Sequence, residues 1–257
     1  MGLLDNKVAF ITGGASGIGE GTARRFIEES ARVVVADVNA ARGQAICEEL
    51  GSHALYAQCD VSVAASVKAA LEQAVNQFGR LDIVFANAGI NGVWAPIDEL
   101  EPEEWSRTLD VNLKGTYLTL HYAIPHLKQT GAGSIIITSS VNGNRVFSTA
   151  GASAYSTSKA GQITLMRMAA LELGRHHIRC NAVCPGPIRT NIGESTERRG
   201  TDKLRIKIEM PEGSPAINNG RGVPKDVADT CLFLASDLSR HVSGVEIYVD
   251  GGDSLMR

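Results

Sequence analysis

The sequence predicts an α/β fold, in which one doubly wound sheet of seven mostly parallel strands carries helices on both faces. Short apolar runs alternate with segments of helical periodicity along most of the 257 residues. This alternation is typical of parallel strands joined by crossover helices. No internal repeat, low-complexity tract or linker divides the chain, so residues 1–257 are expected to form a single domain.

The expected strands are continuous apolar runs, as strands buried on both faces should be. They lie near residues 8–12, 32–36, 53–57, 81–86, 133–138, 178–183 and 245–249, with helical patterns between them at, for example, 62–78, 101–129 and 153–175. Residues 190–222 break this rhythm, because they are rich in Gly, Pro and charge, lack a strand pattern and are helical only briefly around Lys203–Glu209. A long connection after the sixth strand is well placed to be a lid over a ligand.

A glycine-rich turn, TGGASGIG (residues 12–19), lies between the first strand and the first helix. Glycine permits positive φ and close backbone approach, and the helix that follows directs free N–H groups at an anion. This arrangement predicts a Rossmann-type dinucleotide site that includes Gly13, Ser16, Gly17, Ile18 and Gly19. The alternative is a glycine-rich turn without a ligand.

Asp37 ends the second apolar run, 18 residues after Gly19. A carboxylate there accepts hydrogen bonds from a ribose 2′-hydroxyl and repels a 2′-phosphate. No Arg or Lys lies between Gly14 and Ile18 or in the pair that follows Asp37. NAD is therefore favoured over NADP, and the alternative role for Asp37 is to cap the next helix.

Tyr155 and Lys159 are spaced i and i+4, which places them on one face of a helix. An ammonium about 4 Å away stabilises a phenolate by roughly 4 kcal/mol at an effective dielectric near 20. That is enough to lower the tyrosine pKa from about 10 by up to about three units before desolvation opposes it. The pair is thus a candidate acid/base for an alcohol or carbonyl, although such spacing alone also occurs in surface packing.

With these motifs in place, the chain resembles the short-chain dehydrogenase/reductase family, in its shorter, non-extended branch, over residues 5–252. The matching features are the Thr12–Gly19 turn, Asp60-Val61, Asn87-Ala88-Gly89, Asn112, Ser140, Tyr155, Lys159, and Pro185-Gly186 with Thr190. No single motif is specific, but their joint occurrence in this order is.

The resemblance implies catalytic roles for Asn112, Ser140, Tyr155 and Lys159, with Asn112 holding a water that links Lys159 to solvent. It implies a cofactor site made of Gly13, Ser16, Gly17, Ile18, Gly19, Asp37, Asp60, Val61, Asn87, Ala88, Gly89, Tyr155, Lys159, Pro185, Gly186, Ile188 and Thr190. It also implies a homotetramer, assembled through the helices near 101–129 and 153–175 and the last strand.

The serine departs from the usual family spacing. Ser140 lies 15 residues before Tyr155, whereas the family often has 13, and that offset is occupied by Asn142. We interpret the difference as a loop two residues longer, with Ser139 as the alternative to Ser140. Predicted substrate contacts are Ser140, Asn142, Trp94 and Arg145.

The polar cluster of Asn142, Asn144 and Arg145 favours a sugar, polyol or hydroxyketone as the substrate. A 3-oxoacyl-thioester reductase of the same fold is one alternative, although such enzymes usually favour NADP, which Asp37 opposes. An enoyl reductase is disfavoured, since Gln162 stands where its lysine would fall. A catalytically silent NAD-binding module is the remaining alternative, and it would be expected to lose Tyr155 or Lys159.

Composition excludes several other classes of function. A net charge of −3 without blocks of like charge disfavours nucleic-acid binding. No apolar run approaches the roughly 18 residues of a membrane span, and the first strand begins too early for a signal peptide. Five cysteines without tight pairs indicate reduced thiols, and Cys180 and Cys184 lack the second pair of a metal site. The expectation is a cytoplasmic enzyme without a metal, acting on a small alcohol or ketone.

Overall fold

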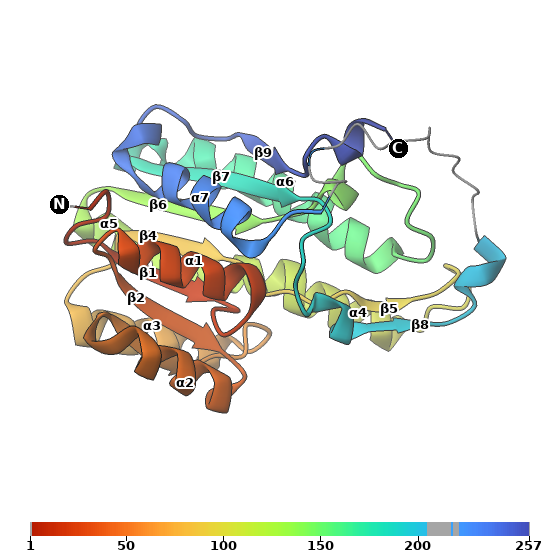
Figure 1. Cartoon of the computed structure of the whole chain (residues 1–257), viewed down its shortest axis with the longest axis horizontal. Coiled ribbons are helices and arrows are strands. Elements are labelled where there is room, and N and C mark those ends of the chain that lie inside the picture. Colours follow the sequence, from red (N-terminus) through yellow and green to blue (C-terminus); the bar gives the residue numbers. More distant parts are fainter. Residues whose placement is uncertain (1, 205–216, 218–220, 257) are drawn as a thin grey trace.

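Seven parallel strands form one sheet in the order β3-β2-β1-β4-β6-β7-β9 in the computed structural model, which describes residues 2–204, 217 and 221–256 (Figure 1). The strands are β1 (Val8–Thr12), β2 (Arg32–Asp37), β3 (Ala54–Gln58), β4 (Ile83–Ala86), β6 (Gly133–Thr138), β7 (Ile178–Pro185) and β9 (Glu246–Val249). Each predicted strand is confirmed. The strand order reverses beside β1, which pairs with β2 on one side and β4 on the other.

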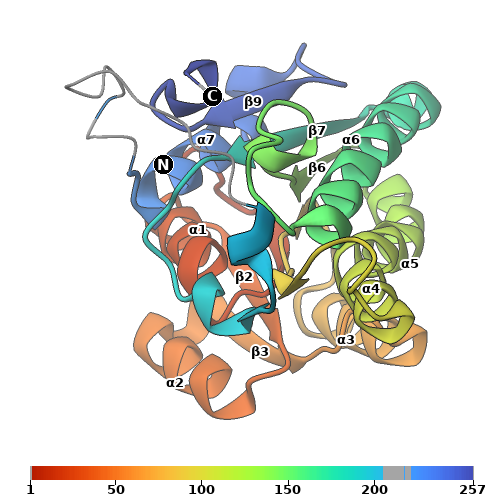
Figure 2. The ribbon, with the colours of Figure 1, turned by 90° about the vertical axis from the view of Figure 1, so that its right-hand side faces the viewer.

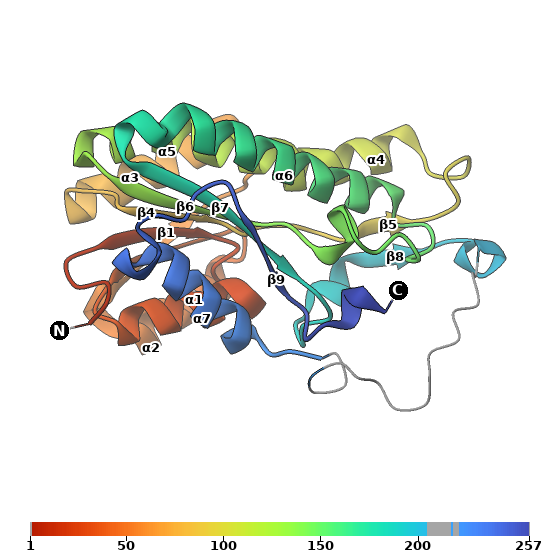
Figure 3. The ribbon, with the colours of Figure 1, turned by 90° about the horizontal axis from the view of Figure 1, so that it is seen from above.

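Helices cover both faces of this sheet (Figures 2 and 3). One layer contains α1 (Gly17–Glu28), α2 (Ala40–Leu50) and α7 (Pro224–Ala235), and the other contains α3 (Ala64–Phe78), α5 (Gly115–Thr130) and α6 (Ser153–Leu173). The single helix expected at 101–129 is α4 (Pro102–Leu109) and α5, joined by a π-helical segment, Asp110–Lys114. Single 3₁₀ turns occupy Gly51–His53, Val141–Gly143, Gly174–His176, Ile192–Ser195, Thr201–Leu204, Asp237–Ser239 and Asp253–Leu255.

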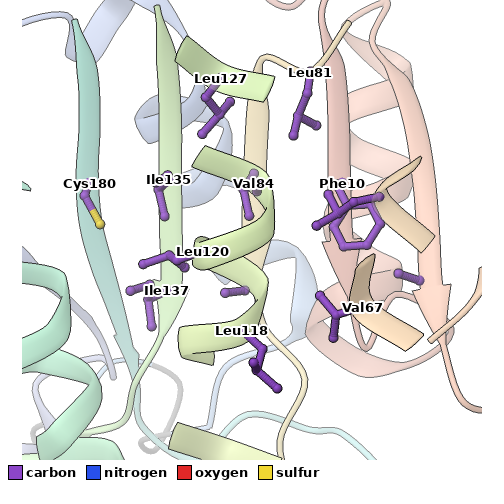
Figure 4. Packing of buried hydrophobic residues seen from close by; sticks show 14 of the residues in the cluster. Phe10, Val67, Leu81, Val84, Leu118, Leu120, Leu127, Ile135, Ile137 and Cys180 are labelled. Atoms are coloured by element: carbon purple, nitrogen blue, oxygen red, sulfur yellow. The ribbon is translucent and has the colours of Figure 1, made fainter. Parts of the chain in front are cut away.

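Two apolar cores lie on the two faces of the sheet, because successive strand side chains point to opposite sides. On β1, Phe10 enters the core under α3 and α5, whereas Ala9 and Ile11 enter the core under α1 and α7. Figure 4 shows the first core, where Leu120 and Leu127 of α5 cover Ile135 and its neighbours. This packing fixes the carboxyl ends of all seven strands at one edge.

The opposite edge of the sheet, at the amino ends of the strands, is formed by the loops that lead from the helices into the strands. Gly79 and Gly131 end α3 and α5 there, each in the left-handed conformation that glycine adopts without strain. No atom lies within 4 Å of where a Cβ would stand at either glycine. These turns are therefore open to solvent.

A second, two-stranded parallel sheet lies beyond the carboxyl edge, formed by β5 (Gly92–Trp94) and β8 (Thr196–Arg198) (Figure 1). The prediction that 190–222 contains no strand is wrong on this point. A polar three-residue strand shows no periodicity, and its partner lies about a hundred residues away. Most of the helical pattern expected around Lys203–Glu209 lies outside the described residues. Within the described part of the chain, no helix is long and apolar enough to cross a membrane.

Candidate active site

A cavity of about 1180 Å³ opens at the carboxyl edge of the sheet. Almost all of the predicted site residues line it, namely Gly13, Ser16, Gly17, Ile18, Asp37, Asp60, Val61, Asn87, Ala88, Gly89, Trp94, Ser140, Asn142, Tyr155, Lys159, Pro185, Gly186, Ile188 and Thr190. Gly19, Asn112 and Arg145 are not in its wall. Residues from seven separate stretches of sequence thus meet in one cavity, as expected where parallel strands end.

The glycine turn forms a cradle that side chains would fill. Gly13 and Gly17 have φ of 63° and 53°, and a Cβ on Gly19 would stand 2.1 Å from the Gly13 carbonyl oxygen. Ser16 begins α1 without a side-chain cap, so the first N–H groups of the helix remain available. An anion such as a pyrophosphate fits this cradle, and Thr190 lies over it, 3.2 Å from where a Gly17 Cβ would be.

Asp37 braces the turn against the end of β2. Its Oδ2 accepts from the Ala15 N–H at 3.0 Å and its Oδ1 from the Asn39 N–H at 2.9 Å. The cap of α2 is Asn39, whose side chain accepts from the Arg42 N–H, so the capping alternative for Asp37 does not hold. The carboxylate is therefore fixed at the cavity wall, where a ribose would meet it.

Asn87 joins three strand ends. Its Nδ2 donates to the carbonyls of Thr12 at 3.1 Å and Gly13 at 3.3 Å, and its Oδ1 accepts from the Thr138 hydroxyl at 3.0 Å. These bonds occupy the amide, so Asn87 shapes the glycine turn. Asp60 accepts from both the N–H and the hydroxyl of Ser62, which holds its carboxylate at the wall.

Tyr155 and Ser140 meet across the cavity from α6 and the end of β6. Burial raises the pKa of Tyr155 above its usual value, and the neighbouring Ser140 side chain opposes this shift in part by favouring the phenolate. Ser139 instead donates to the Lys159 backbone carbonyl at 2.9 Å. Of the two serines, Ser140 is the one that acts on the pKa of the tyrosine, because the Ser139 hydroxyl is bonded elsewhere.

Lys159 is buried one turn along α6 from Tyr155. Its Nζ donates to the Thr138 carbonyl at 2.8 Å and lies 5.6 Å from the Tyr155 ring centroid. Burial lowers the pKa of Lys159 to about 8. The pKa of Tyr155 is raised and not lowered as expected, because desolvation dominates it, while Lys159 Nζ is bonded to the Thr138 carbonyl.

Asn112 lies in the π-helical segment, which confirms that the helix is interrupted there. Its Oδ1 accepts from the Ile90 N–H at 2.8 Å, and its Nδ2 donates to the Ile90 carbonyl at 2.9 Å and to Ser158 at 3.0 Å. Its backbone carbonyl accepts from Thr116 at 2.7 Å and from Gln162 at 2.9 Å. Asn112 thus fixes the loop after β4 from behind the cavity wall.

The structure does not bring Arg145 to the cavity. Its guanidinium is exposed, stacked 3.3 Å over the Tyr248 ring and 3.4 Å from the Ser254 hydroxyl. Asn142 does line the wall, and its Nδ2 donates to Thr149 at 2.8 Å. Cavity residues that the sequence did not single out include Glu103, Ser106, Arg107, Asp110, Val146, Thr149 and Asp253, whereas Ile192, Glu194 and Ser195 come from the segment expected to be a lid. None of these belongs to a local motif.

Residues 192–204, within the segment expected to be a lid, are held beside the cavity by contacts with the chain around α4 and β5. Arg199 donates to Glu104 of α4 at 2.9 and 2.8 Å and to the Glu99 carbonyl at 2.6 Å. The Arg198 guanidinium lies 4.4 Å over the Trp94 ring. Ile192, Glu194 and Ser195 of this segment line the cavity wall.

A glycine turn with free helix N–H groups, a carboxylate at the end of β2 and a Tyr–Ser–Lys cluster line one cavity, which is typical of a nucleotide-dependent oxidoreductase acting on alcohols or carbonyls. The family described as Enoyl-(Acyl carrier protein) reductase matches residues 13–254. The chain belongs to the short-chain dehydrogenase/reductase family.

The similarity to known proteins extends over almost the whole length of the chain. Momilactone A synthase of Oryza sativa subsp. japonica is 41% identical, over 98% of this chain and 92% of the relative. A 3-ketoacyl-ACP reductase structure from Sinorhizobium meliloti 1021 is 45% identical with a TM-score of 0.92, over 97% and 100% of the two chains. A 3-ketoacyl-(acyl-carrier-protein) reductase from Brucella melitensis complexed with NADH is 34% identical with a TM-score of 0.87, over 98% and 99%.

Proposed function

We propose that the protein is an NAD(H)-dependent oxidoreductase that interconverts a secondary alcohol and its carbonyl, with Tyr155 as the acid/base. The observation that carries this proposal is that Ser140, Tyr155 and Lys159 line the same cavity as the glycine turn, with Lys159 one turn along α6 from Tyr155. Gly17, Asp37 and Tyr155 line this one cavity, so they would be in place to hold a dinucleotide beside the proposed acid/base. The NADH complex of the Brucella relative supports the same cofactor class.

The residues of the cavity have two kinds of proposed role: some bind the cofactor or the substrate, and others transfer the proton. The cofactor, when bound at the glycine turn, supplies the hydride acceptor or donor. In the oxidation, the substrate hydroxyl gives its proton to the Tyr155 phenolate as the C–H hydride leaves, and Ser140 holds the substrate oxygen by a hydrogen bond. Lys159, which lines the same part of the cavity, would hold the nicotinamide ribose of the bound cofactor, as the family resemblance implies.

The preference for NAD rests on Asp37. Its carboxylate is fixed by two backbone N–H groups at the end of β2. A 2′-phosphate would place two further negative charges against it, whereas a 2′-hydroxyl would donate to it. The next residue, Val38, is exposed and offers no positive charge.

The substrate is proposed to be a small polar alcohol such as a polyol, a sugar or a hydroxyketone. The side chains of Asn142, Thr149 and Asn91 at the cavity wall support this choice, although Arg145 no longer does. A 3-oxoacyl thioester is the second candidate, because two similar structures carry the name of that reductase. A silent NAD-binding module is disfavoured because Tyr155 and Lys159 are both present and adjacent.

The test follows cofactor absorbance with NAD and NADP separately, using polyols, secondary alcohols, hydroxyketones and an acetoacetyl thioester. We expect turnover of at least one polar alcohol with NAD, loss of turnover in Tyr155→Phe, and unchanged NAD binding in that variant. Thioester reduction alone would favour the second candidate. If NAD binds but no compound turns over, and Tyr155→Phe behaves as the wild type does, the silent module is the correct assignment.

We further propose that the protein is a homotetramer and that it is cytoplasmic. Tyr117 on α5 and Met168 and Leu171 on α6 are 49%, 50% and 78% exposed, which leaves apolar surface on two long helices. All five cysteines are free, as a reducing compartment would keep them. Light scattering at micromolar concentration should give four times the mass of the chain, and a monomer mass would remove this part of the proposal.

A further inference from the structure

Gln162 is a fully buried polar side chain that the proposed chemistry does not use. It lies on α6, three residues beyond Lys159. Its Nε2 donates to the Asn112 carbonyl at 2.9 Å and to the Thr116 hydroxyl oxygen at 2.7 Å. Its Oε1 is also buried and has no hydrogen-bond partner among the described residues.

The orientation of this amide is fixed by its neighbours. The Thr116 hydroxyl donates its proton to the Asn112 carbonyl at 2.7 Å, so its oxygen can only accept from Gln162. Exchanging the amide nitrogen and oxygen would place Oε1 against two acceptors. The unpartnered atom is therefore an acceptor that faces away from the π-helical segment.

The Asn112 carbonyl has no capacity left for another donor. A carbonyl oxygen has two lone pairs, and here they accept from Thr116 and Gln162. The family resemblance implied that Asn112 holds a water linked to Lys159. In this chain the Gln162 amide occupies one of the two places such a water could take.

We propose that Gln162 Oε1 binds a buried water and that this water exchanges protons with Lys159, in place of a water on the Asn112 carbonyl. Buried acceptors without protein partners are typical sites of bound water. Positions i and i+3 share a helix face, and both side chains approach Asn112. Gln162 Nε2 donates to the Asn112 carbonyl, while Asn112 Oδ1 and Lys159 Nζ lie 3.2 and 3.5 Å from where a Cβ on Gly89 would stand. Gln162 is a positioning residue, and its role rests on the proposed function, because the proton it handles comes from the substrate through Tyr155 and leaves to solvent.

Two substitutions separate this role from simple packing. Gln162→Met keeps the volume but has neither an amide nor room for a water, whereas Gln162→Ala opens space in which a water can bond the freed Asn112 carbonyl. The proposal predicts that Gln162→Met lowers kcat about tenfold, with partial recovery as imidazole buffer is added. It predicts that Gln162→Ala retains kcat within about threefold, because water restores the link. If Gln162 only fills space, Gln162→Ala should lower kcat more than Gln162→Met does, because the Ala variant leaves the larger void.

Met166, one turn further along α6 and fully buried, provides the matched control. Met166→Leu should change neither kcat nor the response to imidazole, and NAD affinity by calorimetry should stay within about twofold in all three variants, because none contacts the cofactor cavity. Thermal unfolding of each variant shows whether the fold is intact.

A crystal structure of the full chain at high resolution gives a readout independent of activity. We expect an ordered water within about 3.2 Å of Gln162 Oε1 in the wild type, and one on the Asn112 carbonyl in Gln162→Ala. An Oε1 contacted by protein atoms alone, or a wild-type water on the Asn112 carbonyl, would overturn the inference. So would Gln162→Ala losing more activity than Gln162→Met. Absence of wild-type turnover would instead contradict the proposed function and leave the water positions to decide this inference.

Discussion

Replacing the buried Lys159 with Met should stabilise the cofactor-free protein near neutral pH while abolishing turnover. Burial lowers the pKa of Lys159 from 10.5 to about 8. At roughly 1.4 kcal/mol per pKa unit, this shift corresponds to about 3 kcal/mol of destabilisation whenever the side chain is charged in the fold. Losing the bond to the Thr138 carbonyl costs about 1–2 kcal/mol in return. Lys159→Met should therefore be about 1–2 kcal/mol more stable at pH 7.

The pH dependence of the wild-type stability tests whether the lowered pKa of Lys159 causes the destabilisation. Between pH 8 and 10.5 the unfolded chain binds the lysine proton more tightly than the folded protein does, so wild-type stability rises with pH across this window. The advantage of Lys159→Met should shrink above pH 8 and disappear by about pH 10. Urea unfolding of the cofactor-free protein at several pH values measures the difference, with exposed Lys68→Met as the control. A Lys159→Met protein that is less stable than the wild type at pH 7, by an amount independent of pH, would refute the reasoning.

Three further predictions concern the turn, the cofactor and the lid. Gly19→Ala should abolish NAD binding in calorimetry and lower the unfolding midpoint, because its Cβ would stand 2.1 Å from a backbone oxygen, whereas Gly174→Ala, which meets no atom within 4 Å, should do neither. Asp37→Ser should shift the ratio of kcat/KM for NAD to that for NADP toward NADP by at least about tenfold, and an unchanged ratio would contradict the assigned role. Arg199→Leu should accelerate hydrogen exchange in residues 192–204 several-fold by removing the bonds to Glu104, and unaltered exchange would show that the lid is held otherwise.

The main sheet was predictable because its strands are buried on both faces, so each is an apolar run between helical patterns. The short β5–β8 sheet was not, because Thr196–Arg198 is polar and pairs with a strand distant in sequence. This sheet is accompanied by a tertiary contact, in which the Arg199 N–H donates to the Trp94 carbonyl. The local β-propensity of the sequence cannot reveal such a contact.

The site was predictable where a motif fixes the backbone, as at the glycine turn and at Asp37. It was not predictable where side-chain direction decides the role. Arg145 is near Ser140 in sequence, yet it stacks on Tyr248 outside the cavity. The spacing of Tyr155 and Lys159 placed them on one helix face, but it could not show that Nζ turns to a carbonyl. In the sequence, Gln162 served only to disfavour an enoyl reductase, because it stands where the lysine of such an enzyme would fall.

The open turns at Gly79 and Gly131 suggest how this protein can be modified for use. They lie at the edge of the sheet opposite the cavity, and no atom approaches the space a side chain would enter. A surface anchor, a fluorescent label or a short peptide joined at either turn would project into solvent, a full strand length from the reacting groups. The same parallel arrangement that gathers the chemistry at one edge thus leaves the other edge available for immobilisation.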